Sequence, residues 1–480
     1  MAKRNRDLER LDREEAVRKT IIKIAAAVVG VIVLILLIVA SIRKMRAAEL
    51  KKQEEQAAAE EAARIEAEAA AKAAEEANDY EEIVFPSDAS YTEKVTILGT
   101  GDNLIHESLY KDAETEEGYD FKPMYEHIKE AVSSADIATL NQETPLADAV
   151  APISGYPKFN SPHEVGNALA DAGFDVINEG NNHVMDQGVD GLLATLDFWD
   201  SIGVPYVGAY RDMDDLLKRR IIEVNGIKVA FLGFVEDVNE AIPSDSGVQI
   251  VHFYDEDMIE DLIKDAKSNA DLVVVHAHWG NEDEDVISEA MQVYSRKMVD
   301  WGADIIFGNH THILQNLEIL KRESDGKLCP VIYSLGNFVS GQQKREQLLS
   351  GLMTVTCGKN PETGDTRVEG ISFRPVVTHY EGDRENVTIY PVDEYNDDLC
   401  WENGVKTDDY PLTMDFLWDA VNKHISKQFL DAKSRAAYET YVKNKELKAA
   451  EEAAAQAEAE TKAEGEKLSL LVEPEEDGEA

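Results

Sequence analysis

Five short apolar segments each run directly into side chains that can bind a metal ion, and this repeated junction constrains the fold more than any other feature of the chain. Runs of this length, rich in β-branched residues, are typical of buried strands. In α/β proteins, ligands bind outside the carboxyl ends of the strands, so residues far apart in sequence converge there. The segments are KVTILGTGD ending at Asp102, DIATLNQE ending at Glu143, FDVINEGNNH ending at Asn182 and His183, DLVVVHAHWG containing His278, and ADIIFGNHTH containing His310 and His312.

The side chains at these junctions favour a divalent metal site. Imidazole together with carboxylate and amide oxygen suits Zn, Mn, Fe or Co better than Ca or a thiolate-bound ion. His310 and His312 are two positions apart, which in extended backbone places both on one side, as joint coordination of an ion requires. His276 would share a strand face with His278 and is a weaker candidate.

Each of these residues also has an ordinary structural explanation. A histidine at a strand end is more often a hydrogen-bonded structural residue than a ligand, Asp102 can cap a loop, and Glu143 can be a surface acid. The alignment of four or more such residues on strand ends favours one shared site over these separate explanations.

Residues 24–42 form an apolar run without any charged residue, of the length that crosses a bilayer as a helix. A buried core helix would show a polar face, which this run lacks. Basic residues flank the run on both sides, so the charge distribution favours a cytoplasmic N-terminal segment, 1–23, only modestly. No small-residue cleavage site follows closely, which predicts an uncleaved anchor. The predicted location is the cell membrane, with a single span and an extracytoplasmic main domain.

The rest of the chain divides by composition. Residues 43–92 are mostly Ala, Glu, Lys and Gln as far as about residue 78, which predicts a helical stalk followed by a linker. The middle, 93–395, alternates β-branched and amphipathic stretches and is long enough to bury a core. A helical region is predicted at 396–465, and the acidic tail 466–480 is predicted to be disordered.

Charge and cysteine content narrow the choice of partners. The formal net charge of −46 makes nucleic acid an unsuitable partner. An anionic substrate would need local positive charge, which bound metal ions can supply. The three cysteines, Cys329, Cys357 and Cys400, form no CxxC pair and are interpreted as buried small hydrophobes, although one disulfide is not excluded.

Motifs across residues 94–345 resemble, in content and order, those of the CapA family, named for a poly-γ-glutamate capsule synthesis protein. The motifs are GDNLIH, LNQETPL, GFDVINEGNNHVMDQG, HAHWGNEDE, GADIIFGNHTHILQNLE and YSLGNFVSG. The CapA family is in turn similar to the calcineurin-like metallophosphoesterases. That similarity implies an α/β fold, a four-layer αββα metallophosphoesterase-like sandwich, preceded here by the predicted transmembrane helix and Ala/Glu-rich stalk.

The resemblance implies roles for seven residues and one or two divalent ions, Mn, Fe or Zn. His183 would be the proton donor or transition-state stabiliser, and the metal ligands would be Asp102, Glu143, Asn182, His278, His310 and His312.

Two departures from the metallophosphoesterase pattern put one metal position in doubt. The D-x-H motif is absent because Leu104 occupies its third position, and G-D-x-x-D is replaced by Asn141-Gln142-Glu143. His106 either compensates for this loss or is an ordinary loop histidine.

The implied activity is metal-assisted hydrolysis of a phosphoester or an amide, in the synthesis, trimming or export of capsule or poly-γ-glutamate. The expected partners are an anionic polymer or phosphoester substrate, the membrane through residues 24–42, and other membrane proteins of a polymer synthase. Two alternatives stay open. One is a non-catalytic membrane component of a synthesis or export complex that uses the metal site for structure or anion binding, and the other is a structural envelope linker with a vestigial site.

Overall fold

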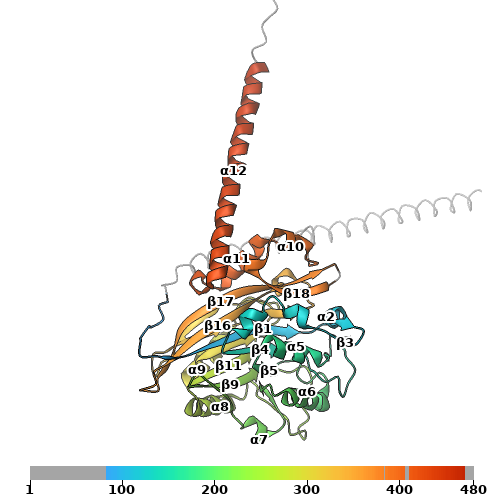
Figure 1. Cartoon of the computed structure of the whole chain (residues 1–480), viewed down its shortest axis with the longest axis vertical. Coiled ribbons are helices and arrows are strands. Elements are labelled where there is room, and N and C mark those ends of the chain that lie inside the picture. The colour runs from blue at the N-terminus through green and yellow to red at the C-terminus, as the bar shows by residue number, and fades with distance from the viewer. Residues whose placement is uncertain (1–82, 383, 406–409, 471–480) are drawn as a thin grey trace, which may run out of the picture. The chain divides into compact units, whose positions relative to one another are not determined.

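The structure is a computed structural model that describes residues 83–382, 384–405 and 410–470 (Figure 1). The predicted N-terminal segment 1–23, the span 24–42 and most of the predicted stalk lie outside the described residues. Residues 83–92, the end of the predicted linker, precede the first strand and are neither helical nor extended in a sheet. Among the helices of the described ranges, none has the length and apolar character required to cross a bilayer.

Two β-sheets form the centre of the molecule. The larger sheet has, in spatial order, β18 (Glu385–Pro391), β17 (Thr366–Glu381), β16 (Leu349–Lys359), β1 (Glu93–Leu104), β4 (Ile137–Gln142), β5 (Val176–Asn178) and β6 (Tyr206–Val207), with β15 (Asn337–Ser340) paired to the end of β1. The smaller sheet has the order β13 (Leu317–Lys321), β14 (Leu328–Ile332), β12 (Ile305–Asn309), β11 (Leu272–His278), β9 (Ile227–Val235) and β8 (Arg220–Val224). Strands β1, β4, β5 and β6 run parallel in the first sheet, as do β9, β11, β12 and β14 in the second.

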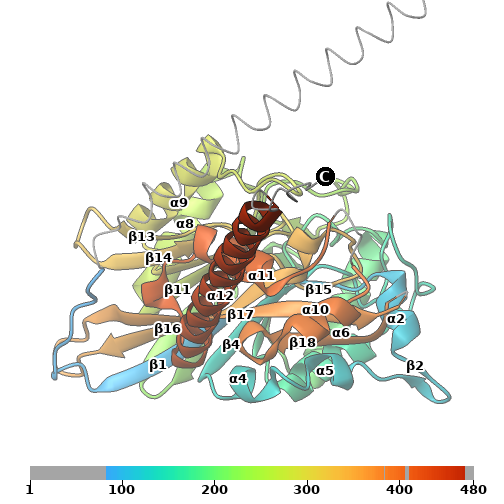
Figure 2. The same ribbon diagram turned by 90° about the horizontal axis from the view of Figure 1, so that it is seen from above.

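Helices pack on both sides of the pair of sheets, as in a mixed α/β domain. Figure 2 shows α8 (Glu256–Asn269) and α9 (Glu289–Trp301) on one side of the strands, and α5 (Glu164–Ala172) and α6 (Gly188–Ile202) on the other. Ile259 of α8 packs in one core cluster with Val273 and Val275 of β11. Val274, which points to the opposite face of β11, belongs to a second and larger cluster that contains residues of both sheets. This alternation along one strand is what a strand buried on both faces requires.

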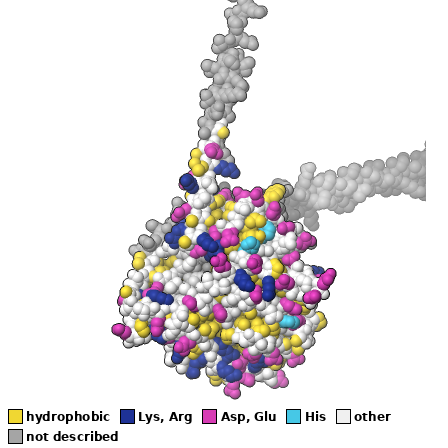
Figure 3. Space-filling view, in the orientation of Figure 1, with side chains coloured by type: hydrophobic (Ala, Val, Ile, Leu, Met, Phe, Trp, Pro, Cys, Tyr) yellow, Lys and Arg dark blue, Asp and Glu magenta, His cyan; other side chains and the backbone are white. Residues whose placement is uncertain are grey.

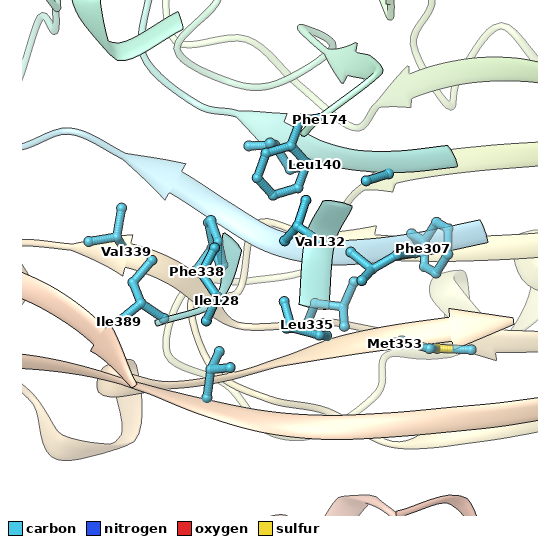
Figure 4. Packing of buried hydrophobic residues seen from close by; sticks show 14 of the residues in the cluster. Ile128, Val132, Leu140, Phe174, Phe307, Leu335, Phe338, Val339, Met353 and Ile389 are labelled. Atoms are coloured by element: carbon cyan, nitrogen blue, oxygen red, sulfur yellow. The ribbon is translucent and has the colours of Figure 1, made fainter. Parts of the chain in front are cut away.

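The two sheets approach each other closely where β1 crosses β12. A Cβ atom on Gly99 would lie 2.5 Å from the Phe307 ring, so only glycine fits at this position. On the helical side of the larger sheet, Phe174 packs edge-on against Phe338, with ring centroids 5.7 Å apart (Figure 4). Phe338 is thus a residue of the core, with no exposed surface.

Several local predictions can be compared directly with the structure. The five junction segments form β1, β4, β5, β11 and β12, as predicted. Asn225 and Gly226 form a two-residue turn, both with positive φ, between the antiparallel strands β8 and β9. All three cysteines are free and buried. The short elements are α2 (Glu107–Asp112), β2 (Glu114–Thr115), β3 (Gly118–Tyr119), α3 (Lys122–Tyr125), α4 (Lys129–Ser133), β7 (Ala209–Tyr210), α7 (Met213–Leu216), β10 (Gln249–Ile250), η1 (Arg345–Leu348), η2 (Val392–Glu394) and η3 (Lys427–Phe429).

The C-terminal region is helical and packs beside β17. It contains α10 (Asp397–Glu402), α11 (Met414–His424) and α12 (Ala432–Leu470). Trp418 of α11 is buried, and the ring of Tyr438 at the start of α12 lies 5.4 Å from it. Helix α12 continues to Leu470, five residues into the segment expected to be disordered, because its Ala, Glu and Lys residues are strong helix formers and the first proline comes at Pro474. Residues 471–480 lie outside the described part.

Candidate metal centre

The candidate centre is built where the carboxyl ends of strands from both sheets meet. Asp102 lies at the end of β1, after a bulge in which Gly99 pairs with Thr139 and Asp102 pairs with Asn141, so that β1 has one more residue than β4. Such an extra residue redirects the side chains that follow it. Gly101 sits in this bulge, where a Cβ atom would lie 1.9 Å from the carbonyl oxygen of Gly336. The bulge therefore depends on glycine.

Asp102, Glu143 and His312 form the first of two groups at this centre that can hold a metal ion, and all three are buried; a third group, Asp148, His163 and Glu164, is more exposed and does not share a residue with either. The Nδ1 atom of His312 is 3.6 Å from Oδ2 of Asp102, and its Nε2 atom is 4.0 Å from Oε1 of Glu143. Asn337 accepts a hydrogen bond from Nδ1 of His312 at 3.0 Å through its side-chain oxygen. A ligand histidine commonly donates its second ring nitrogen to such a partner, which fixes the ring orientation.

Glu143, His278 and His310 form the second group. Oε1 of Glu143 lies 3.6 Å from Nε2 of His278, and the His278 and His310 ring centroids are 4.6 Å apart. Glu143 thus belongs to both groups. One carboxylate shared by two ligand sets is an arrangement that can hold two ions side by side.

Some of these candidate ligands have buried polar atoms without hydrogen-bond partners in the described part of the chain, and a divalent cation would satisfy them. Oε1 of Glu143 and Nδ1 of His310 are buried and have no hydrogen-bond partner among the described residues. Burial raises the pKa of Glu143 well above its usual value, and the neighbouring Asp102 carboxylate raises it further. Buried polar groups are normally satisfied, and a buried carboxylate pair needs a compensating positive charge. Carboxylate and imidazole donors suit Zn, Mn or Fe.

Burial also keeps two of the candidate histidines neutral, as metal ligands must be. It lowers the pKa of His310 to about 4 and lowers that of His278 well below the usual value. For His312, burial acts in the same direction, but the contact with the Asp102 carboxylate outweighs it and the pKa is raised. Neutral imidazole is the metal-binding form.

Two asparagines connect the strand ends around these ligands. The side-chain oxygen of Asn182 accepts a hydrogen bond at 3.0 Å from Nε2 of His278, so Asn182 lies beside the second group. The Asn141 amide donates to Oδ1 of Asp102 at 2.7 Å, and its own oxygen accepts from Asn178 at 2.9 Å. The sequence assigned no function to Asn141 or Asn337, although both stand in the quoted motifs LNQETPL and YSLGNFVSG.

His183 lies next to the centre and is held by a carboxylate. Its Nδ1 atom is 2.8 Å from Oδ2 of Asp186 and 3.2 Å from the Asn239 amide. The Asp186 side chain is completely buried, and the same Oδ2 atom accepts the backbone N–H of Phe159 at 2.7 Å. Asp186 was missed by the sequence interpretation. The signal was its place three residues after His183, in HVMDQG.

The prediction for His310 and His312 was wrong in its geometry. Strand β12 ends at Asn309, and both histidines follow it in a loop, with φ of 95° for His310 and 62° for His312. Positive φ is uncommon for residues with a side chain and occurs where surrounding structure enforces it. The two rings therefore enter different ligand groups and do not share one face of a strand.

The other two histidine candidates lie outside both groups. His276 shares the inner face of β11 with His278, but its Nε2 atom pairs with the Thr139 hydroxyl at 2.8 Å and so links the two sheets. Nδ1 of His106 lies 3.2 Å from the Leu104 carbonyl oxygen and 3.2 Å from the Gly341 backbone nitrogen. The structure thus favours the ordinary loop role for His106.

Comparison with known proteins decides the family. A sequence model of the family described as bacterial capsule synthesis protein PGA_cap matches residues 96–342, which is more than half of the chain and contains every candidate ligand. The chain belongs to this family. The resemblance found in the motifs is thereby confirmed.

Two relatives of known name illustrate the similarity. The capsule biosynthesis protein CapA of Bacillus anthracis is 31% identical over 54% of this chain and 63% of the relative. The PGA biosynthesis protein CapA of Bacillus subtilis is 36% identical over 36% of this chain and 44% of the relative. The chain thus matches less than two thirds of the length of either relative.

Comparison with solved structures found two further proteins that align with part of this chain. One is a phosphatase from Mycoplasma pneumoniae, at 15% identity and a TM-score of 0.37, covering 59% of this chain and 94% of that one. The other is a 5'-nucleotidase from Candida albicans, at 13% identity and a TM-score of 0.35, covering 71% of this chain and 59% of that one.

Proposed function

We propose that this PGA_cap-family chain is a metal-dependent hydrolase that acts on a capsule or poly-γ-glutamate polymer of the cell envelope. The observation that carries the proposal is the pair of ligand groups that share Glu143, with His183 held beside them by Asp186. The polymer class comes from the printed names of the relatives, a capsule biosynthesis protein and a PGA biosynthesis protein. The proposal includes a relationship of this chain to the calcineurin-like metallophosphoesterases.

In the proposed hydrolysis, the metal ligands, His183 and Asp186 would have different roles. A divalent cation held by Asp102, Glu143, His278, His310 and His312 would polarise a phosphoryl or carbonyl oxygen and lower the pKa of water. The hydrogen bond between Nδ1 of His183 and Asp186 leaves Nε2 as the nitrogen that exchanges a proton with the substrate. Asp186 fixes the ring, so that Nε2 of His183 would be placed to give a proton to the leaving group.

The same set of residues supports hydrolysis of a phosphoester or of an amide. In both reactions negative charge develops on an oxygen, and in both the leaving group needs a proton. The proposal therefore includes phosphodiesters and γ-glutamyl amides as substrate classes.

A second candidate function rests on the depth of the site. His183, Asn182 and His312 are only 4%, 6% and 2% exposed, which leaves little room for a polymer to reach the centre without movement. In this alternative the metal holds the strand ends together, and the chain is a non-catalytic component of a polymer synthesis or export complex.

The setting of the enzyme in the cell is part of the proposal. The uncharged run 24–42 would anchor the chain as a single span, with the metal domain on the extracytoplasmic side and with other membrane proteins of a polymer synthase as partners. Acidic side chains are spread over the face of the domain drawn in Figure 3. On such a surface, the metal centre would provide positive charge for an anionic substrate.

Replacement of His183 distinguishes the two functions. Full-length protein purified in detergent and loaded with Mn²⁺ should hydrolyse bis(p-nitrophenyl) phosphate or a γ-glutamyl anilide. His183→Ala should abolish turnover and keep the metal content, because His183 is not in either ligand group. His163→Ala, which changes a half-exposed surface histidine, is the control.

The same variants separate the functions in cells. Loss of polymer with normal protein levels in the His183→Ala strain supports hydrolysis. Wild-type turnover by the purified variant, or normal polymer output from the strain, would contradict the proposal and favour the non-catalytic role.

A further inference from the structure

The loop of residues 151–160 reaches His183 and is fixed more firmly than a surface connection requires. Ser154 and Asn160 exchange two backbone hydrogen bonds of 2.9 Å across its base. The Asn160 side chain donates to the carbonyl oxygens of Ala151 and Pro152, at 2.9 and 3.0 Å, and accepts from the Ala147 backbone at 2.9 Å. These hydrogen bonds, within the loop and to Ala147, connect its two ends.

Neighbouring elements brace the loop at its tip and its side. A Cβ atom on Gly155 would lie 3.0 Å from Cβ of Glu107, so the tip packs directly on the start of α2. Lys158 forms an ion pair of 2.8 Å with Glu240. Gln187 donates to the Phe159 carbonyl at 2.9 Å, which ties the loop to the segment that carries His183.

Phe159 connects this loop to the proposed catalytic histidine. Its ring is edge-on to the His183 ring at 4.7 Å between centroids, and to the His106 ring at 5.1 Å. Its backbone N–H donates to the same Asp186 oxygen that binds His183. Phe159 itself is 1% exposed, so it supports the site and cannot meet a large ligand.

Tyr156 differs from Phe159 in exposure. Its ring packs edge-on against Phe159, with centroids 6.1 Å apart, and 76% of the residue is exposed. An aromatic ring held on a rigid loop, one ring away from His183, presents a planar apolar face at little cost in conformational entropy. Folding does not need this exposure, since Phe159 already fills the core position.

We propose that Tyr156 is a substrate-contacting residue whose ring stacks on the planar group that flanks the reacting bond. This inference rests on the proposed hydrolase function. For a poly-γ-glutamate substrate the planar group would be the next amide of the chain, and for an aryl phosphodiester it would be the second aryl ring. Tyr156 would then set affinity and selectivity and take no part in proton transfer.

Two phosphodiester probes test this role in the full-length, Mn²⁺-loaded protein. Bis(p-nitrophenyl) phosphate carries a second ring for Tyr156, whereas methyl p-nitrophenyl phosphate does not. Tyr156→Ala should raise KM for the first probe by about 3- to 10-fold, the range expected for one aromatic contact. It should leave KM for the second probe, kcat for both and the metal content within about twofold, and Tyr156→Phe should behave as wild type.

Tyr254→Ala is the matched control, because Tyr254 is 75% exposed and stacks on His252, a residue outside the candidate centre. It should change neither KM. An unchanged KM in Tyr156→Ala, an equal change for both probes, or a fall in kcat with both probes would overturn the inference. Absence of turnover in the wild-type protein would instead overturn the proposed function, and this inference with it.

Discussion

Asp186 binds one nitrogen of His183 and leaves the other for proton transfer in the proposed hydrolysis. The buried carboxylate binds Nδ1 at 2.8 Å and is held in turn by the backbone of Phe159. A hydrogen bond of this kind selects one tautomer of the imidazole and one ring orientation. In the proposed hydrolysis Asp186 would therefore be a positioning residue, because it would act on the substrate only through His183.

Asp186→Asn tests this positioning role. The amide has nearly the same shape but cannot stabilise the protonated ring, so kcat/KM should fall by about 10- to 100-fold. Metal content should stay at the wild-type level, because Asp186 is in neither ligand group. Asp190→Asn, an exposed change on the first turn of α6, should leave kcat/KM unaltered. Equal activity of Asp186→Asn and the wild type would show that His183 needs no carboxylate.

The sequence predicts the candidate ligands better than it predicts their supports. Five of the six predicted ligands fall into the two groups because strand ends can be read from hydrophobic runs. Asn182, the sixth predicted ligand, lies beside the second group and contacts His278. Asn141, Asn337 and Asp186 were missed because their roles come from tertiary contacts that local patterns do not encode. The loop geometry of His310 and His312 was missed because positive φ has no signature in a histidine side chain.

At the scale of elements, the bulge in β1 aims Asp102 at the centre. The backbone N–H of Asp102 donates to the Gly336 carbonyl oxygen at 2.9 Å, which joins β1 to the turn before β15. This contact is close enough that Gly101 has no room for a side chain. The geometry of the candidate metal centre thus depends on Gly101 and on the backbone of Gly336.

Gly101→Ala should destabilise the domain by about 1 to 3 kcal/mol, the usual cost of overpacking, because the added methyl group would overlap a backbone oxygen. It should also weaken metal binding, because Asp102 is the next residue. Chemical denaturation and metal analysis measure the two effects. Gly370→Ala in β17 is the control, because a Cβ atom there meets nothing within 4 Å. Equal stability of Gly101→Ala and Gly370→Ala would contradict this account of the bulge.

Helix α11 docks on the domain through a partly buried, neutral histidine. Nδ1 of His424 is 2.7 Å from the side-chain oxygen of Asn316, and burial, with a smaller contribution from Lys423, lowers the pKa of His424 to about 4. In the unfolded chain the same group titrates near 6.5. Between these values the unfolded state binds more protons, so stability falls as the pH drops from about 6.5 to about 4 and is unaffected by this residue above that range.

His424→Gln should reduce the fall in folding stability between pH 6.5 and pH 4. Glutamine can keep a polar contact with Asn316 but cannot bind a proton, so the variant should lose about 1 to 3 kcal/mol less than the wild type between pH 6.5 and pH 4. The free energy of unfolding, measured by denaturant titration across this range, provides the comparison. Identical pH profiles would show that His424 is not buried as a neutral group.

The strands were predictable because apolar runs of β-branched residues mark them, and the turn at Asn225–Gly226 because its residues tolerate positive φ. The assignment of the five junctions to two separate sheets was not predictable from their individual patterns. It depends on contacts such as that of Thr139 with His276, which joins strands 137 residues apart in sequence.

At the scale of the whole molecule, two sheets contribute to one centre. Asp102 and Glu143 lie at or just after strand ends of the larger sheet, and His278, His310 and His312 lie at or just after strand ends of the smaller one. The family match ends at residue 342, so the centre lies inside it, whereas β16 to β18 and the C-terminal helices lie beyond it. A cation in the centre would link the two sheets, and binding to the folded state alone would stabilise it.

The metal content of full-length protein and of Glu143→Gln tests the central claim most directly. Elemental analysis of wild-type protein, prepared with Mn²⁺ and then desalted, should give one or two equivalents of metal. Glu143→Gln should lose most of it, because Glu143 belongs to both groups, whereas Glu164→Gln, in a separate and more exposed cluster, should lose none. Metal-free wild-type protein, or full metal content in Glu143→Gln, would contradict the account.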